Sequence, residues 1–285
     1  MVSRKAPTPT LRSRWLGSRL RQLREESGLS IEEVADYLQR NMGTVSRFEN
    51  GIYPVRRPDM QAMLTLYGVN EPRRRETLTG LSESVWRTGW WDGYADDFRE
   101  FVDFVWLEEQ ADEQLLFDNT VLPGLLQTED YARAVIEAAE FDGSAEYIER
   151  GVALRMERQK ILDRRNLRIR SIIDEALLHR QAGGPEIMRD QLRHLLACAQ
   201  RPSVQLRVLP FSAGMHASPT GSFILFKMAE PYPEVTCVET LKGALYIELP
   251  DSEAVAERYD RLWEVSLGQE ESAALIAARI EERAL

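Results

Sequence analysis

The sequence has few of the residues on which secreted, membrane-spanning and metal-binding proteins depend. It contains two cysteines, Cys198 and Cys237, which lie far apart without metal-ligand spacing, and three histidines. We therefore expect reduced thiols rather than a disulfide framework. No apolar run approaches the roughly 20 residues of a membrane helix, and MVSRKAPTPT at the N-terminus lacks the apolar stretch of a secretory signal. These absences predict a cytoplasmic protein that does not bind membranes.

Lysine is also scarce, and charge is distributed unevenly along the chain. Four of the 36 basic residues are lysines, so arginine is the usual cation here. The net charge is −10, yet residues 1–80 carry 14 basic and 9 acidic side chains, a balance of +5, against −15 for the rest. The length of 285 residues suggests about two domains. The asymmetry predicts that only the front domain binds a polyanion, weakly and with strong salt dependence.

Residues 29–50, LSIEEVADYLQRNMGTVSRFEN, predict two short helices joined by a tight turn. Ser30 and Glu33 have the spacing of a capping box at the start of the first helix. A stripe of apolar residues at helical spacing follows, made of Ile31, Val34, Ala35 and Leu38. Asn41 is a typical N-cap for the second helix, in which Val45 and Phe48 would face inward.

The opposite face of the second helix is polar and would point outward. It carries Gly43, Ser46, Arg47 and Asn50. Small residues, an amide and an arginine suit hydrogen bonds to base edges and phosphates. The flanks agree, since an apolar helical stripe upstream stops at Gly28 and Pro58 opens another helix downstream. The pattern predicts a helix-turn-helix.

The stretch GLSIEEVADYLQRNMGTVSRFENG resembles the Cro/C1-type (XRE) helix-turn-helix family. The resemblance implies an all-α domain of four to five helices that binds double-stranded DNA, usually as a homodimer. It implies that the major groove is faced by Asn41, Met42, Gly43, Thr44 and Arg47. It implies that phosphates are faced by Arg19, Arg21, Ser46 and Asn50. It also pairs Arg24 with Glu49 in a largely buried salt bridge.

Two positions depart from the family pattern. Gln39 stands in the turn where the family usually has glycine, which costs about 1 kcal/mol if that residue is left-handed. Gly43 offers no side chain, so base readout would rest on Met42, Thr44 and Arg47, with a contribution from DNA shape. The alternative interpretation is a helical unit used for protein contacts, in which these polar residues are merely solvated.

We divide the chain into four segments. Residues 1–14 are expected to be a disordered arm, 15–70 the helix-turn-helix domain, 71–92 a helical connector and 93–285 a second domain. In the arm, Arg4 and Lys5 would touch phosphate weakly. In the connector, Arg73, Arg74 and Arg75 would continue the basic face. Its tryptophans, Trp86, Trp90 and Trp91, would pin the domains together or, alternatively, form a platform for a partner.

The second domain changes character along its length. Its first half predicts helices over 98–116, 129–139 and 155–163. Short runs rich in β-branched and aromatic residues follow at 167–174, 204–210, 221–228, 235–241 and 243–249, with helices over 185–200, 252–267 and 270–284. The first two strands enclose a helix of the length needed for a parallel crossover. We expect an α+β fold with one mixed sheet of about five strands and flanking helices.

Several segments of this domain resemble the DUF5753 domain: VLPGLLQTEDYARAV, RMERQKIL, IIDEALLHR, VLPFSAGMH and VETLKGALYIE. That domain follows an XRE-type helix-turn-helix in actinobacterial regulators, including sporulation regulators of the WhiJ type, and some members are antitoxin-like. The resemblance implies a transcriptional regulator. It also implies a small partner protein encoded nearby, often of the DUF397 type, whose effect passes through this domain.

Two alternatives remain for the second domain. It would hold a small-molecule pocket near residues 211–221, or it would be a metal-dependent enzyme tethered to DNA. Glu175 and His179 are four residues apart on one helix, but no HExxH motif or third ligand accompanies them. No glycine-rich phosphate loop occurs either. We therefore expect no catalytic residue, no metal and no cofactor.

Three residues are candidates for contact with a ligand or partner. His216 and Phe211 belong to the loop FSAGMHASPTG, which is rich in Gly, Ser and Pro. Functional residues often lie on loops. Glu108 is the third, although for it we favour a solvated helical face shared with other acidic residues. Those neighbours are Glu109, Asp112 and Glu113.

Overall fold

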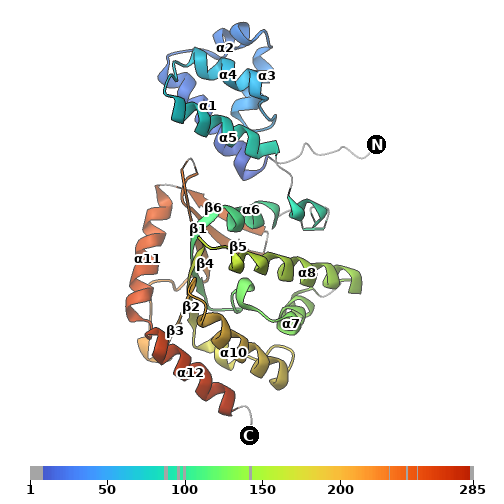
Figure 1. Ribbon diagram of the computed structural model, residues 1–285, viewed down its shortest axis with the longest axis vertical. Helices are drawn as coiled ribbons and strands as arrows, with labels where there is room; N and C mark the ends of the chain where they lie inside the picture. The colour runs from blue at the N-terminus through green and yellow to red at the C-terminus, as the bar shows by residue number, and fades with distance from the viewer. Residues whose placement is uncertain are drawn as a thin grey trace. The chain divides into compact units, whose positions relative to one another are not determined.

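The computed structural model describes residues 9–86, 89–94, 97–98, 101–140, 143–230, 232–241, 243–248 and 250–282. It divides into two compact units, Met1–Trp90 and Trp91–Leu285 (Figure 1). Arg4 and Lys5, and with them most of the expected arm, lie outside the described residues. Among the described residues, none of the helices is both long and apolar enough to cross a bilayer.

The first unit consists of helices within its described residues. They are α1 (Leu11–Glu26), α2 (Ile31–Leu38), α3 (Met42–Glu49), α4 (Arg57–Leu66) and α5 (Pro72–Trp86). Helix α1 begins inside the segment expected to be disordered, because Thr10 Oγ1 accepts the backbone N–H of Ser13 and Leu11 is completely buried. Helix α1 therefore includes residues 11–14, which were expected to belong to the arm.

Helix α5 corrects the expected connector. It packs against α1 and α4, and buries Leu78 and Leu81 in the first unit. Ser82 donates its hydroxyl hydrogen to the Val55 carbonyl at 2.8 Å. Arg75, predicted to extend the basic face, donates to the Val69 carbonyl at 2.9 Å. Residues 72–86 are thus the fifth helix of the unit rather than a link between units.

Two glycines bring α1 close to the end of α3. A Cβ atom on Gly17 would lie 2.6 Å from the carbonyl oxygen of Glu49. A Cβ on Gly51, which has a φ of +67°, would lie 2.6 Å from the carbonyl carbon and oxygen of Ser13. Larger residues would force the two helices apart, so these glycines fix where α3 lies on α1.

The second unit is built on a six-stranded mixed sheet in the order β3-β2-β1-β4-β5-β6. The strands are β1 (Ala111–Asp118), β2 (Arg168–Asp174), β3 (Val204–Leu209), β4 (Phe223–Met228), β5 (Val235–Thr240) and β6 (Gly243–Glu248). Strands β1, β2 and β3 pair in parallel, whereas β4 pairs antiparallel with β1 and with β5, and β5 with β6. The α+β class and the parallel crossover are confirmed.

The central strand of this sheet was predicted wrongly. Helix α6 (Val102–Gln110) ends where β1 begins, so the helix expected over 98–116 does not continue. Strand β1 is covered on both faces, and its residues Gln114 to Phe117 are all buried. Because Leu115, Leu116 and Phe117 follow one another, the apolar residues have no period of two, and periodicity does not distinguish them from a buried helix.

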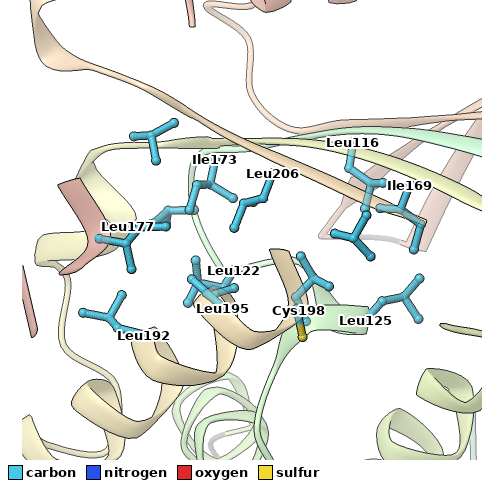
Figure 2. Close-up of a cluster of buried hydrophobic side chains, with 14 of the residues drawn as sticks. Leu116, Leu122, Leu125, Ile169, Ile173, Leu177, Leu192, Leu195, Cys198 and Leu206 are labelled. Atoms are coloured by element: carbon cyan, nitrogen blue, oxygen red, sulfur yellow. The ribbon is translucent and has the colours of Figure 1, made fainter. Parts of the chain in front are cut away.

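Helices cover both faces of the sheet (Figure 1). They are α7 (Glu129–Ala139), α8 (Ala145–Arg158), α9 (Ala176–His179), α10 (Pro185–Ala199), α11 (Asp251–Val265) and α12 (Gln269–Glu282). On one face, Leu116 joins the cluster formed with Leu192 and Leu195 of α10 (Figure 2). On the other face, Phe117 packs against Tyr259 of α11. Leu116 and Phe117, neighbours in β1, thus pack into hydrophobic cores on opposite faces of the sheet.

Helix α8 begins ten residues before the expected start at residue 155. Ser144 caps it by accepting the backbone N–H of Tyr147 at 3.1 Å. The first turns of α8 mix apolar and charged residues, so their apolar spacing did not predict a helix.

Candidate DNA-binding surface

The turn between α2 and α3 has the geometry of a helix-turn-helix. Gln39 ends α2 with φ 54° and ψ 44°, in the left-handed region, and is the one residue other than glycine in the described part of the chain with positive φ. The following N–H, that of Arg40, donates to the Ala35 carbonyl at 2.9 Å. This left-handed residue reverses the chain within three residues and sets the start of α3.

The start of α2 is held by a complete capping box. The Ser30 hydroxyl accepts the backbone N–H of Glu33 at 3.2 Å, and Glu33 Oε2 accepts the backbone N–H of Ser30 at 2.8 Å. The backbone N–H and the hydroxyl of Ser30 both donate to this carboxylate and lower the pKa of Glu33, the backbone N–H having the largest effect. The sequence predicted this cap.

Asn41 caps α3 with its side chain. Its Oδ1 accepts both the backbone N–H and the hydroxyl of Thr44, at 2.8 and 3.0 Å. Met42, the first residue of the helix, keeps 56% of its surface exposed. At the start of α3, the side chains of Asn41 and Thr44 are therefore tied to each other, and Met42 is free to extend outward.

The inner side of α3 is fully packed. Val45 is completely buried and Phe48 is 6% exposed, and α3 contacts both α1 and α2. Arg47, between them in sequence, is exposed to solvent. The apolar anchors therefore fix which side of the helix faces outward, as the spacing predicted.

An ion pair joins α3 to α1 beneath this surface. Arg24 donates from Nε to Glu49 Oε1 at 2.6 Å and from Nη2 to Oε2 at 3.1 Å, and it also donates to the Leu29 carbonyl at 2.9 Å. The Glu49 side chain is 1% exposed and that of Arg24 12%. The hydrogen bond to Glu49 raises the pKa of Arg24, despite the opposing effect of burial. This is the pairing that the resemblance implied.

The guanidinium of Arg47 is held above an aromatic ring. Its Cζ lies 5.1 Å from the centre of the Tyr53 ring, and a Cβ on Gly43 would lie 4.0 Å from its Nη1. The ring restrains the cation, and the missing side chain at Gly43 leaves room around it. Tyr53 was not among the predicted site residues, because it follows the helix and its contact depends on the turn at Asn50 and Gly51.

A second arginine lies along the edge of the same surface. Arg21 donates to Asn50 Oδ1 at 2.8 Å, and Asn50 Nδ2 donates to the Ser46 carbonyl at 2.7 Å. Arg19 donates to Gln22 at 2.6 Å. The oxygen and the nitrogen of the Asn50 amide are thus both hydrogen-bonded within the unit. At this edge, the exposed group is the guanidinium of Arg21.

Comparison with protein families agrees with this architecture. A model of the helix-turn-helix domain matches residues 15–78, and a model of a domain of unknown function, DUF5753, matches residues 101–278. The chain belongs to the DUF5753 family. No curated protein and no solved structure matches it. The resemblances to a helix-turn-helix and to DUF5753 are confirmed, and the helix-turn-helix domain supports a DNA-binding regulator.

In the DUF5753 domain, Glu108 corrects the expected acidic surface. It is 3% exposed, and Arg158 donates to both of its carboxylate oxygens at 2.8 Å. Asp112 and Glu113 belong to β1 rather than to a helix shared with Glu108. The local pattern could not show this pairing, since its partner lies 50 residues away.

The other candidates in the DUF5753 domain do not gather at one site with Glu108. His216 accepts the backbone N–H of Ser218 at 3.3 Å, and Phe211 is 58% exposed beside the His179 ring. Glu175 lies 3.5 Å from His179 and also accepts the backbone N–H of Phe211. Within the described ranges, no group of three or more His, Cys, Asp or Glu residues is placed to hold a metal ion.

Proposed function

We propose that this protein is a sequence-specific transcriptional regulator of the XRE type, which places α3 in the major groove of DNA. The observation that carries the proposal is the orientation of α3. Val45 and Phe48 anchor the helix, and the exposed guanidinium of Arg47 is restrained by the ring of Tyr53. A short, exposed, capped helix with a restrained arginine matches the way repressor-type domains contact bases.

The contacts divide between bases and phosphates. Arg47 has the geometry to donate two hydrogen bonds to guanine, and Met42 offers an apolar contact to a thymine methyl group. Asn41, Gly43 and Thr44 form the adjacent surface of the helix start. These residues would supply sequence readout, with DNA shape contributing where Gly43 has no side chain.

Phosphate contacts fall to the edge of the surface. Arg21 and Arg19 would bind the DNA backbone together with Ser46, which lies beside Asn50. Asn50 would act by holding Arg21 in place, since its amide is engaged on both sides. These contacts orient the unit on the duplex without reading sequence.

We further propose that two copies act together on a two-fold symmetric operator. The basic excess of the first 80 residues is only +5, which gives a single copy weak affinity at physiological salt. Two reading helices spaced by one helical turn of DNA, about 34 Å, would offset this. Such a regulator acts in the cytoplasm, where a bacterial chromosome lies.

The DUF5753 domain would then receive the signal that alters DNA binding. Its family resemblance favours a small partner protein of the DUF397 type, in an antitoxin-like arrangement. Co-expression with the product of the adjacent small gene tests this: a stable complex supports the partner, whereas separate elution of the two proteins contradicts it.

The DNA proposal is tested by substituting Arg47 in the full chain. Random duplexes are first selected on the wild-type protein, and affinity for the selected sequence is measured by fluorescence anisotropy. Loss of one bidentate base contact should make Arg47→Ala weaker by about 1–3 kcal/mol, roughly 5- to 150-fold, and relax the preference for the selected sequence.

Arg57→Ala is the matched control, because Arg57 is a 72% exposed cation on α4 in the same unit. It should lower affinity for selected and scrambled duplexes equally and only slightly. Failure to enrich any sequence, or an Arg47→Ala protein that binds like wild type, would overturn the proposal.

A further inference from the structure

The second unit contains a cavity of about 500 Å³ that the function proposed above does not use. Its walls come from the end of β1, the loop that follows, α8 and the β4–β5 pair. Apolar side chains form much of the lining, among them Phe104, Leu116, Leu122, Ile224 and Val238. A volume of this size is typical of sites that enclose a small organic molecule.

Charged groups also line the cavity, and one pair of them is satisfied internally. Arg158 and Glu108 neutralise each other through two hydrogen bonds of 2.8 Å. The Arg158 guanidinium also lies 4.8 Å from the centre of the Phe104 ring. This pair is part of the wall and has little capacity left for a ligand.

In the described part of the chain, Arg155 makes no ion pair, although the charges of Glu239 and Glu108 favour its cationic form. Within the described residues its guanidinium donates to one group, Gln127 Oε1 at 2.7 Å, which is neutral. Burial, with repulsion from Arg158, lowers the pKa of Arg155 to about 10. The guanidinium therefore remains charged near neutral pH, and it has N–H donors left for an anionic ligand.

Asp118, at the end of β1, is the second unsatisfied group. Its Oδ2 is sealed from solvent, and no hydrogen-bond partner for it occurs among the residues that the structure describes. Burial, followed by the charge of Glu239, raises the pKa of Asp118. Burial thus favours the neutral carboxyl group, which can donate a hydrogen bond, and Asp118 is one of the residues that line the cavity.

We propose that this cavity binds a small amphipathic organic anion, with Arg155 pairing with the anionic group, Asp118 as a second polar contact and the apolar wall enclosing the body. The ligand class is an unbranched or aromatic body with one carboxylate-like group. What the second unit binds does not depend on DNA binding, whereas its use as a regulatory signal rests on the proposed function.

Three probes of equal chain length test the ligand class on the full chain. Isothermal titration calorimetry is run with decanoate, decylamine and decanol. We expect one decanoate to bind per chain, at least tenfold tighter than either of the others. Equal affinity for all three, tighter binding of decylamine, or no binding of decanoate would overturn the proposal.

Two variants locate the site. Arg155→Met keeps an unbranched apolar stem and removes the charged guanidinium, and should weaken decanoate binding at least tenfold. Ala139→Trp places a bulky ring at an exposed position that lines the cavity, and should also block binding. Because Ala139 is exposed, this second variant tests the site even if Arg155→Met fails to fold.

Arg193→Met is the matched control, since Arg193 is 58% exposed on α10 and outside the cavity. It should bind decanoate like wild type. Unchanged decanoate affinity in both Arg155→Met and Ala139→Trp would place the ligand elsewhere and contradict the assignment. DNA anisotropy, measured separately with and without decanoate, reports on the regulatory role and leaves these binding results unaffected.

Discussion

Each of the two units buries an arginine–glutamate pair. The two pairs differ in whether another charged group lies close to the glutamate or arginine that would remain after its partner is removed. In the first unit, Arg24 and Glu49 join α1 to α3, and Glu49 has a second cation, Arg21, at 3.6 Å. In the second unit, Arg158 and Glu108 join α8 to α6, with side chains that are 6% and 4% exposed.

The comparison shows that the cost of breaking an ion pair depends on what remains for the surviving charge. A charge left alone in the interior is far more costly than one that has water or another counter-charge nearby. In the first pair, Glu49 would keep Arg21 nearby if Arg24 were removed. Among the described residues, the second pair has no third group in salt-bridge distance, so the same substitution should have a larger effect there.

The largest effect is expected for Glu108→Gln. It keeps the shape of the side chain but removes the paired carboxylate of the buried Arg158 cation and leaves only the weaker effect of Glu239. It should lower the free energy of unfolding of the second unit by about 3–5 kcal/mol. Calorimetry of the full chain measures it. The double variant Glu108→Leu, Arg158→Met should recover most of the loss, and a single-variant loss below about 1 kcal/mol would contradict the argument.

Arg24→Ala should cost less, about 2–3 kcal/mol of the stability of the first unit, because Arg21 remains near Glu49. Arg21→Ala is the control, since that side chain is 45% exposed, and should cost under about 1 kcal/mol. Thermal unfolding of both variants checks the order. If Arg24→Ala lowered the free energy of unfolding as much as Glu108→Gln does, Arg21 would not compensate for the loss of Arg24.

Gln39→Gly should stabilise the first unit by about 1 kcal/mol, because glycine adopts the left-handed conformation without steric cost. Arg40→Gly, one residue later and without positive φ, should instead destabilise it by a similar amount. The midpoint of chemical denaturation distinguishes the two. Destabilisation by both substitutions would mean that Gln39 makes a compensating contact.

Tyr53→Leu should weaken binding of the selected duplex by about two- to fivefold, since a cation–π contact at an exposed site contributes roughly 0.5–1 kcal/mol. Tyr53→Phe keeps the ring and should bind normally. In an Arg47→Ala background, Tyr53→Leu should have no further effect, because Tyr53 acts as a positioning residue for Arg47. Additive losses in the double variant would refute that role.

The smallest effect concerns the capping box of α2. The pKa of Glu33 is lowered from its ordinary value of 4.5, so its contribution is complete above that value and is lost as pH falls through the lowered pKa. The melting temperature of the first unit should therefore fall more between pH 6 and pH 3 in wild type than in Glu33→Gln. Identical slopes would show that the cap is unimportant for stability.

Most elements of both units could be predicted from local patterns. The helix-turn-helix has caps, apolar spacing and glycine stops that all agree, and the strands from β3 onward have Gly or Pro close to at least one end. The errors fell where local patterns carry no information. Strand β1 is buried on both faces, so its apolar run looked helical, and Glu108 looked like a surface acid because its partner is on another helix.

The candidate site shows the same division. The outward face of α3 follows from residue spacing within one helix, and the Arg24–Glu49 pair was implied by family resemblance. The contact of Arg47 with Tyr53 and the use of Asn50 to hold Arg21 were not foreseen. Both depend on how the chain turns after α3 and how α1 lies beside it, which no local pattern encodes.

The sequence by itself determined the helix-turn-helix, because short-range spacing and capping specify it. It indicated the DUF5753 domain through the resemblance of several short segments to that family. Only the tertiary structure decided that Glu108 is an interior counter-ion and that Arg155 and Asp118 line one cavity. Those groups come from segments up to some tens of residues apart. Their charges interact strongly only after folding has brought them together and removed the water between them.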